Sequence, residues 1–414
     1  MPSIRKSLLQ LIFSGSSMKR WNDKLRPIEL YEVDKQGHKM MVAWMLYELN
    51  SRGMPLSEKL ALGEAVVEGG LFDYLYRLVI TDIKPPVFYK IKANPEHYRR
   101  LTAWVVGQLA PRIQVVGDEF TARLRAYLAV PDHQDLAGRI LHAAHIYASR
   151  YEFSLIKQLN PWDEEFDEIE SDFQNTLASH ADLAGVPELL REGSPLERFA
   201  SLCGRLRFQT RWSQTPRIPE TTVLGHLFVV AACAYFFSLE LSACRARRIN
   251  NFFAGLVHDL PELLTRDIIS PVKRSVEGIA DIIQEYEHAE LESRVLGPLR
   301  RGGAEDLAAR LSYFLGLDVG SEFETVVRKK DGKQLKIDWR TLGESYNCDE
   351  FDPKDGHLLK ICDNLAAFLE AYTAVRNGIT SDQLQQALWR IRGQYAQEPF
   401  QHGVHIGALL ADFD

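Results

Sequence analysis

Apolar residues recur at intervals of three and four along much of the chain, a spacing that places them on one face of an α-helix. Other segments are apolar nearly all round, as core helices are. We therefore expect an all-α protein, with a short amphipathic helix near the N-terminus. The pattern predicts further helices over residues 39–48, 96–109, 120–128, 136–159, 225–241, 249–264, 276–296, 356–376 and 381–395.

One segment departs from the helical pattern. Residues 325–328 and 333–338 are two short segments with a strand-like pattern, and Lys329-Lys330-Asp331-Gly332 lies between them. An Asp-Gly pair between two such runs is typical of a β-hairpin turn. The sequence therefore predicts a small β-hairpin inserted into the helical fold.

Several short motifs occur twice in the same order. The first half has Arg-Trp at 20–21, Gly-His at 37–38, Phe-Asp at 72–73 and Asp-Ile-x-x-Pro-Val at 82–87. The second half has the same series at 211–212, 225–226, 258–259 and 267–272, with His-Asp in place of Phe-Asp. A later match, of 144–152 with 362–370, indicates an insertion in the second copy. We expect two tandem helical bundles, 1–190 and 195–414, with the insertion at about 302–356.

Charge and composition exclude some classes of function. The net charge is −7, from 49 basic and 56 acidic residues, so no basic excess indicates a nucleic-acid polymer or an anionic membrane as partner. The longest apolar run, 227–237, is shorter than the roughly 18 residues of a membrane span. The five cysteines form no Cys-x-x-Cys pair, which favours reduced thiols and a cytoplasmic location.

The densest chemistry lies between His258 and Lys273, where an imidazole, three carboxylates and a lysine stand among apolar residues. Charged groups beside so much apolar surface are usually paired or bound to a metal. His226 and Asp363 also interrupt apolar helices. Together with His258 and Asp259 they make two imidazoles and two carboxylates, a set suited to one divalent ion such as Mn, Fe, Co, Ni or Mg. A buried histidine that is merely a core residue is the alternative for His226.

The ordered pattern His…His-Asp…Asp resembles that of the HD-domain phosphohydrolases, and residues 199–372 resemble the bacterial 5′-deoxynucleotidase branch of that superfamily. The resemblance implies that both bundles are HD domains. The matching residues are Arg211, Trp212, His226, His258, Asp259, Glu262, Asp267, Lys273 and Asp363.

The resemblance also implies a role for each residue. His226, His258, Asp259 and Asp363 would hold the ion, and Glu262 would act as general acid or base toward the attacking water. Asp267 would assist the nucleophile or the leaving oxygen. Arg211 and Lys273 would neutralise phosphate charge, while Trp212 would lie against the sugar. Alternatives remain open: Glu262 as a helix N-terminal acid, Asp267 as a cap, Trp212 as a core residue, and Arg211 and Lys273 as surface charges. The chain departs from the family in having Gly225 and Leu227 beside His226.

The first copy lacks most of this set. His38 and Asp73 remain, but Phe72, Tyr76 and His145 stand where the second copy has His258, Glu262 and Asp363. A phenyl ring cannot coordinate a metal, so we expect a degenerate HD domain without turnover. Relatives often form dimers, so the two copies are expected to pair within one chain, with a homo-oligomer as the alternative. A regulatory nucleotide site in the first copy is the rival hypothesis.

These observations predict a metal-dependent phosphohydrolase that releases phosphate from nucleoside 5′-monophosphates, deoxyribonucleotides in particular. The expected partner is the nucleotide substrate, without a membrane or a nucleic-acid polymer. One alternative is hydrolysis of nucleoside triphosphates or of a cyclic dinucleotide, because the insertion could reshape the pocket. The other is a nucleotide sensor or scaffold without turnover, against which the presence of Glu262 and Asp267 argues.

Overall fold

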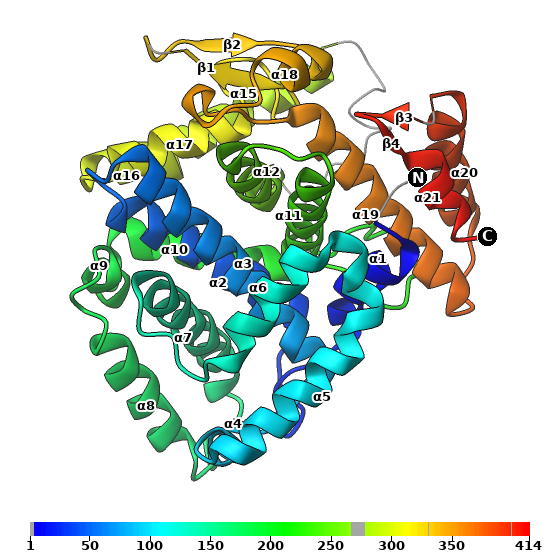
Figure 1. Ribbon diagram of the computed structural model, residues 1–414. Coiled ribbons are helices and arrows are strands. Elements are labelled where there is room, and N and C mark those ends of the chain that lie inside the picture. Colours follow the sequence, from blue (N-terminus) through cyan, green and yellow to red (C-terminus); the bar gives the residue numbers. More distant parts are fainter. Residues whose placement is uncertain (1–3, 266–277, 330, 399) are drawn as a thin grey trace.

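The computed structural model describes residues 4–265, 278–329, 331–398 and 400–414. Within these residues the protein is helical except for two short antiparallel hairpins, which confirms the prediction of an all-α fold (Figure 1). The helices of the first half are α1 (Lys6–Phe13), α2 (Glu32–Asn50), α3 (Leu56–Ile80), α4 (Pro85–Lys92), α5 (Pro95–Ile113), α6 (Asp118–Ala129), α7 (Leu136–Lys157), α8 (Phe166–Ala178) and α9 (Val186–Leu190).

The helices of the second half carry the insertion and the C-terminal hairpin among them. They are α10 (Pro195–Arg205), α11 (Val223–Glu240), α12 (Arg245–Val257), α13 (Glu262–Thr265), α15 (Ile279–Leu291), α16 (Gly297–Arg301), α17 (Glu305–Leu315), α18 (Trp339–Ser345), α19 (Gly356–Arg376), α20 (Asp382–Gln397) and α21 (Ile406–Ala411). The strands are β1 (Val326–Arg328), β2 (Gln334–Lys336), β3 (Phe400–Gln401) and β4 (Val404–His405).

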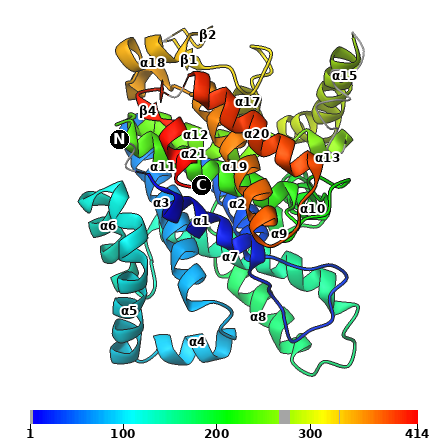
Figure 2. The same cartoon turned by 90° about the vertical axis from the view of Figure 1, so that its right-hand side faces the viewer.

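The core is built around α2 and α11, which pack against each other. Helix α11 contacts α12 and α19, and α2 contacts α3 and α7. Helix α11 is long and apolar enough to cross a membrane, but 89% of it is buried inside the protein. Its apolar surface on every side is therefore explained by neighbouring helices, as in a core helix. Figure 2 shows the hairpin β1–β2 at one end of the molecule and α4 and α8 at the other.

The contact between α2 and α11 is reciprocal. A Cβ atom on Gly37 would lie 3.0 Å from Leu224, and one on Gly225 would lie 2.8 Å from Val33. Each helix therefore has a glycine where the other approaches its backbone. Thr222 Oγ1, four residues before His226, donates to Asp34 Oδ1 (2.7 Å), and Asp34 lies four residues before His38. Matching positions thus meet each other, as they do at an isologous interface.

The short N-terminal helix of each half packs on the other half. Helix α1 lies against α11 and α19, whereas α10 lies against α2 and α7 (Figure 1). Each is followed by one turn of 3-10 helix, Ser14–Ser17 after α1 and Leu206–Phe208 after α10. The two halves are therefore tied together by an exchange of matching helices.

The loop before each central helix has the same hydrogen bonds. Arg20 N donates to Leu30 O (2.8 Å), and Arg211 N donates to Thr221 O (2.9 Å). Matching tryptophans follow, Trp21 with φ 55° and Trp212 with φ 56°. Such left-handed backbone is uncommon for a bulky residue, so its recurrence shows that the two loops share one conformation.

The sequence expectations about the fold were wrong at one helix and missed several elements. The helix expected over 249–264 is interrupted between Val257 and Glu262, because Pro261 has no N–H to donate to the preceding turn. The long helix α3 was not predicted, since glycines such as Gly70, which packs against Met40, break the apolar pattern. The hairpin β3–β4 was not predicted either, because two-residue strands are too short to show alternation.

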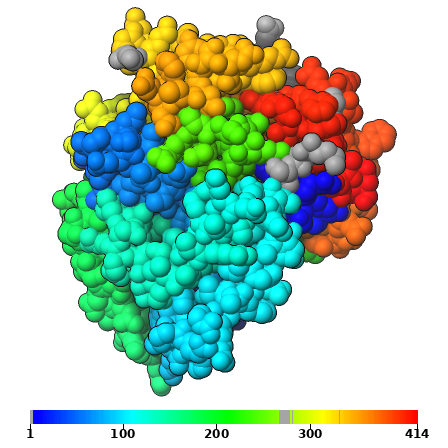
Figure 3. Space-filling model, in the orientation of Figure 1, coloured from blue at the N-terminus to red at the C-terminus, as the bar shows by residue number. Residues whose placement is uncertain are grey.

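The inserted hairpin is confirmed, with Val326 opposite Lys336. It belongs to the segment that also holds α17 and α18. Figure 3 shows this segment, in yellow and orange, gathered at one end of the molecule beside the C-terminal elements in red. Of the helix expected over 276–296, the described part is α15 followed by a π-helical turn, Glu292–Leu296.

Candidate metal centre

Three separate elements bring the expected ligands together. His226 lies in the first turn of α11, His258 and Asp259 directly follow α12, and Asp363 lies within α19. The ligand atoms of His226, His258 and Asp259 all lie within 4.8 Å of one another. Asp363 Oδ1 is 3.1 Å from Nε2 of His226. The structure therefore assembles all four residues that the sequence picked out.

The end of α12 explains how two consecutive residues can face one point. Neighbouring residues in a continuous helix diverge by about 100°. Here the α-helix ends at Val257, and α13 starts only at Glu262. His258 Nε2 consequently lies 3.3 Å from Asp259 Oδ2. The interruption at Pro261 is thus part of the site.

Both imidazoles direct Nε2 toward the other candidate ligands and Nδ1 toward an oxygen atom. Nε2 of His226 is hydrogen-bonded to Asp363 Oδ1, and its Nδ1 makes no well-formed hydrogen bond within the described residues. His258 Nδ1 lies 2.8 Å from the carbonyl oxygen of Gly255, to which it donates a hydrogen bond. His226 Nδ1 lies 3.3 Å from Glu370 Oε1. Metal-binding histidines in proteins are oriented in this way, with the second nitrogen tied to a carbonyl or carboxylate. Nε2 of His258 is buried without a well-formed hydrogen bond in the described part of the chain.

The electrostatics of the cluster favour a cation. Burial would raise the pKa of Asp363, but the hydrogen bond from His226 and the nearby Lys360 hold it well below its usual value. Burial would lower the pKa of His258, yet Asp259 and Asp363 outweigh it and raise that pKa to about 9. The carboxylates therefore attract positive charge to this point, and the donor set of two imidazoles and two carboxylates fits a divalent ion.

Glu370 is a further residue of the site that the sequence reasoning did not assign. It is 2% exposed and lies close to His226, and it receives hydrogen bonds from Trp212 Nε1 (2.8 Å) and Thr221 Oγ1 (3.1 Å). Burial would raise its pKa, but Arg211 and His226 hold it well below its usual value. A signal was present in the sequence, because Glu370 matches Glu152 in the repeat and lies two helical turns after Asp363.

Arg211 and Trp212 both lie at the site, held by its carboxylates. Arg211 NH1 is 3.4 Å from Asp259 Oδ2, and its Nε is 3.4 Å from a carboxylate oxygen of Glu370. The indole N–H of Trp212 is directed to Glu370, and Arg217 lies 5.6 Å from the centre of its ring. Neither residue is a freely exposed surface group.

The expected catalytic residues are only partly described. Glu262 begins α13. Burial would lower the pKa of Arg211, but the negative charges of Glu370, Asp259 and, to a smaller extent, Glu262 raise it. Glu262 therefore lies near the cluster. Asp267 and Lys273 lie outside the described residues.

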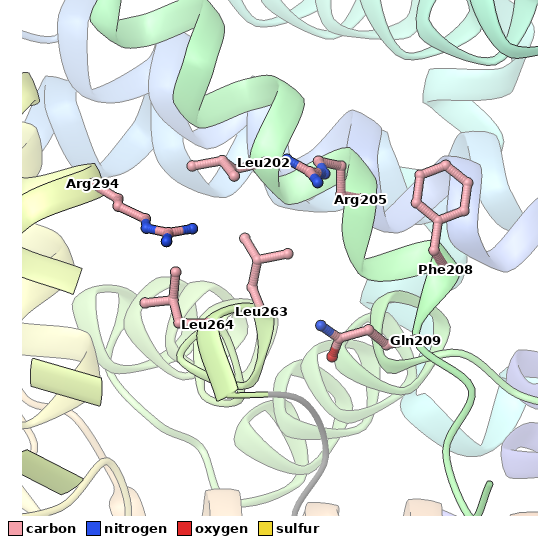
Figure 4. Close-up of a pocket in the computed structure, with 7 residues that line it drawn as sticks. All are labelled: Leu202, Arg205, Phe208, Gln209, Leu263, Leu264 and Arg294. Atoms are coloured by element: carbon pink, nitrogen blue, oxygen red, sulfur yellow. The ribbon is translucent and has the colours of Figure 1, made fainter. Parts of the chain in front are cut away.

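A pocket of about 360 Å³ lies beside the cluster, between the end of α10, α13 and the π-helical turn after α15. Two guanidinium groups, of Arg205 and Arg294, reach it from opposite elements, with leucine side chains between them (Figure 4). The four candidate ligands do not line this pocket, but Leu263 follows Glu262 directly. Its lining residues are Leu202, Arg205, Phe208, Gln209, Leu263, Leu264 and Arg294.

Comparison with known families gives one match. Residues 203–392 match the family model described as the HD domain. The matched range contains His226, His258, Asp259, Asp363 and Glu370, and begins before Arg211. No curated protein and no solved structure matches the chain.

Proposed function

We propose, from the match of residues 203–392 to the HD domain of a superfamily of metal-dependent phosphohydrolases, that the protein removes phosphate from nucleoside 5′-monophosphates, preferring deoxyribonucleotides. The observation that carries the proposal is the cluster of His226, His258, Asp259 and Asp363, in which Nδ1 of each imidazole faces a carbonyl or carboxylate oxygen. These four residues are proposed to hold one divalent ion. A bound ion would supply Lewis acidity toward a phosphoryl oxygen and toward water.

The protein's own groups supply the proton transfers and the charge balance. Glu262 accepts a proton from the attacking water as the phosphorus–oxygen bond to the nucleoside breaks. Asp267 is proposed to assist the nucleophile or the departing 5′-oxygen. Arg211, 3.4 Å from Asp259, holds that carboxylate in place and adds positive charge near the phosphate. Lys273 is proposed to contact the phosphate from the segment after α13.

The pocket beside the cluster supports a nucleotide as the substrate. Its volume of about 360 Å³ lies within the roughly 300–1,000 Å³ range of small-molecule sites. Arg205 and Arg294 offer positive charge, and Phe208 offers an apolar surface for a base. Trp212 is proposed to lie against the sugar, where its bulk would exclude a 2′-hydroxyl.

A substrate panel tests this function. Nucleoside and deoxynucleoside mono-, di- and triphosphates and cyclic dinucleotides are incubated with the protein and Mn, Co or Mg, and released phosphate is measured. Deoxynucleoside monophosphates should release phosphate, Glu262→Ala should stop it, and the matched change Tyr76→Ala in the first half should not. Release of pyrophosphate or triphosphate would replace the proposed activity by triphosphate hydrolysis, and binding without release would indicate a sensor.

We also propose that residues 1–190 are a second, degenerate HD-type unit and that residues 195–414 form the active one. The exchanged helices α1 and α10, the matching loops at Trp21 and Trp212, and the Asp34–Thr222 contact support this arrangement. The two units would form the equivalent of a dimer within one chain. Light scattering should then find a mass near 47.2 kDa, and twice that mass would contradict the arrangement.

A further inference from the structure

The first half has basic side chains where the second half has its candidate ligands. Lys39 directly follows His38 in α2, and its Nζ donates to Asp73 Oδ2 at 2.5 Å. Lys35 lies one turn earlier, and its Nζ lies 2.6 Å from Nδ1 of His145. Asp73 and His145 are the residues that match Asp259 and Asp363. Asp73 and His145 are therefore each bound by a lysine.

The second half has apolar residues at the two lysine positions. Counted from the shared histidine, Lys35 matches Val223 and Lys39 matches Leu227. Both lysines are almost completely buried, with exposed fractions of 2% and 1%. Lysine is seldom buried to this extent unless it is paired. The two positions therefore differ between the halves in charge as well as in size.

His38, which matches the candidate ligand His226, faces away from Asp73 and His145. His38 Nε2 lies 2.9 Å from the carbonyl oxygen of Ala200 in α10, and its ring packs edge-on against Tyr151. Phe72, at the position of His258, packs against Phe120 and Tyr127 instead. Asp73 is held on its other oxygen by the hydroxyl group of Tyr127 (3.1 Å). The polar groups left around Asp73 thus have protein partners.

We infer that the amino groups of Lys35 and Lys39 occupy, in the first half, the place that a divalent ion takes in an HD site. Lys39 is an internal cation that neutralises Asp73. The amino group of Lys35 lies against the ring nitrogen of His145, where a metal ion bound by that nitrogen would lie. The second half instead gathers Asp259, Asp363 and Glu370 around two imidazoles. Arg211 contacts Asp259 and Glu370 there, and the amino group of Lys360, whose side chain is about half exposed, contacts Asp363 from the surface. The first half consequently needs no metal to keep the same helices together. This inference rests on the proposed match between the halves and not on the substrate.

Metal content is the first test. The purified full chain is loaded with Mn, freed of excess metal by gel filtration and analysed for bound Mn. We expect one ion per chain in the wild type and none in His258→Ala/Asp259→Ala. If that variant keeps an ion that is lost on adding Asp73→Ala, the inference is wrong. A chain that binds one ion in the second half but cleaves no nucleotide would contradict the proposed function and leave this inference standing.

Conversion of the site is the second test. The variant Lys35→Val/Lys39→Leu/Phe72→His/His145→Asp carries in the first half the residues of the second. It should bind two ions per chain, while Phe72→His/His145→Asp, which keeps both lysines, should bind one. A folded fourfold variant that still binds one ion would show that the lysines do not hold the place of the metal.

A thermal double-mutant cycle covers the case in which the converted variant does not fold. Lys39→Met should lower Tm by several degrees, because Asp73 loses its cation, and adding Asp73→Asn should restore more than half of the loss. Lys84→Met is the control. Lys84 and Glu165 form an ion pair in which both side chains are exposed, so this change should leave Tm nearly unchanged. Additive effects of Lys39→Met and Asp73→Asn would overturn the inference.

Discussion

His38 and His226 occupy matching places in the two central helices, yet their rings have different surroundings. His226 lies between Asp363 and Glu370, with a ring nitrogen toward each. His38 lies between the carbonyl oxygen of Ala200 and the ring of Tyr151, and burial lowers its pKa to about 3. The same residue type in the same helix position is therefore a candidate ligand in one half and a packing residue in the other. What differs is the charge placed around it.

Glu152 and Glu370, a second pair of matching residues, also differ in their surroundings. Both accept the indole N–H of the matching tryptophan, at 3.1 Å from Trp21 and 2.8 Å from Trp212. The other oxygen of Glu152 is bound by Arg207 (2.9 Å), whereas that of Glu370 faces His226. The hydrogen bond from the tryptophan, which both glutamates accept, holds the loop in place. The second contact differs: Arg207 ties Glu152 to the fold, whereas Glu370 faces the candidate ligand His226.

The largest expected difference between the halves is in activity after loss of a ligand. His258→Ala should remove the bound ion and lower kcat/KM for phosphate release by on the order of 10³-fold or more. Asp73→Ala, at the position of Asp259 in the first half, should leave kcat/KM within a few-fold of the wild type. Both are measured with saturating Mn, alongside EDTA-treated wild type, which should match His258→Ala. A comparable loss in Asp73→Ala would show that the first half takes part in turnover.

Changing the proposed general base should separate chemistry from metal binding. Glu262→Gln should lower kcat by about 10²- to 10⁴-fold, because the attacking water loses its proton acceptor. Bound metal should remain at the wild-type level, which distinguishes this variant from His258→Ala. Tyr76→Phe in the first half is the matched control and should leave kcat unchanged. Loss of the ion in Glu262→Gln would assign Glu262 to the ligands instead.

The two buried glutamates should respond differently to the same substitution. Glu370→Gln should weaken metal binding by about 10- to 100-fold, because His226 loses the carboxylate that orients it. Glu152→Gln should leave metal affinity unchanged and lower the free energy of unfolding by about 3–5 kcal/mol, because Arg207 stays buried without its carboxylate partner and Arg20 keeps only Glu32. Metal titration and denaturant unfolding check the two results. Equal effects of both variants on metal affinity would contradict the comparison.

The helical class and the four candidate ligands could be predicted from the sequence because both depend on local pattern. Apolar spacing located helices such as α19 with both ends correct. The ligands stood out because His226 and Asp363 are polar residues in apolar helices. The motif order also pointed to the loss of the ligand position at Phe72.

The remaining features depend on contacts between segments far apart in the chain. Glu370 follows Asp363 by two turns, but only the structure shows that it receives the hydrogen bonds of Trp212 and Thr221. Lys35 and Lys39 resemble surface charges of a helix in the sequence. Their burial follows from the packing of α2 against α7 and α11, which no local pattern contains. Helix exchange by α1 and α10 is hidden for the same reason.

The smallest expected effect concerns the point where the halves meet. Burial raises the pKa of Asp34 to about 7, although Arg207 and the hydroxyl group of Thr222 oppose it, and the usual value is 3.8. A carboxyl group with a raised folded-state pKa contributes stability that is fully present below its unfolded pKa and is lost as the pH rises through about 7. Asp34→Asn keeps an oxygen that can accept from Thr222 but does not titrate. Its Tm relative to the wild type should therefore rise between pH 4 and pH 8, whereas Asp132→Asn, at an exposed ion pair, should show no such trend. A difference in Tm that stays constant over this range would mean that Asp34 does not titrate at the junction.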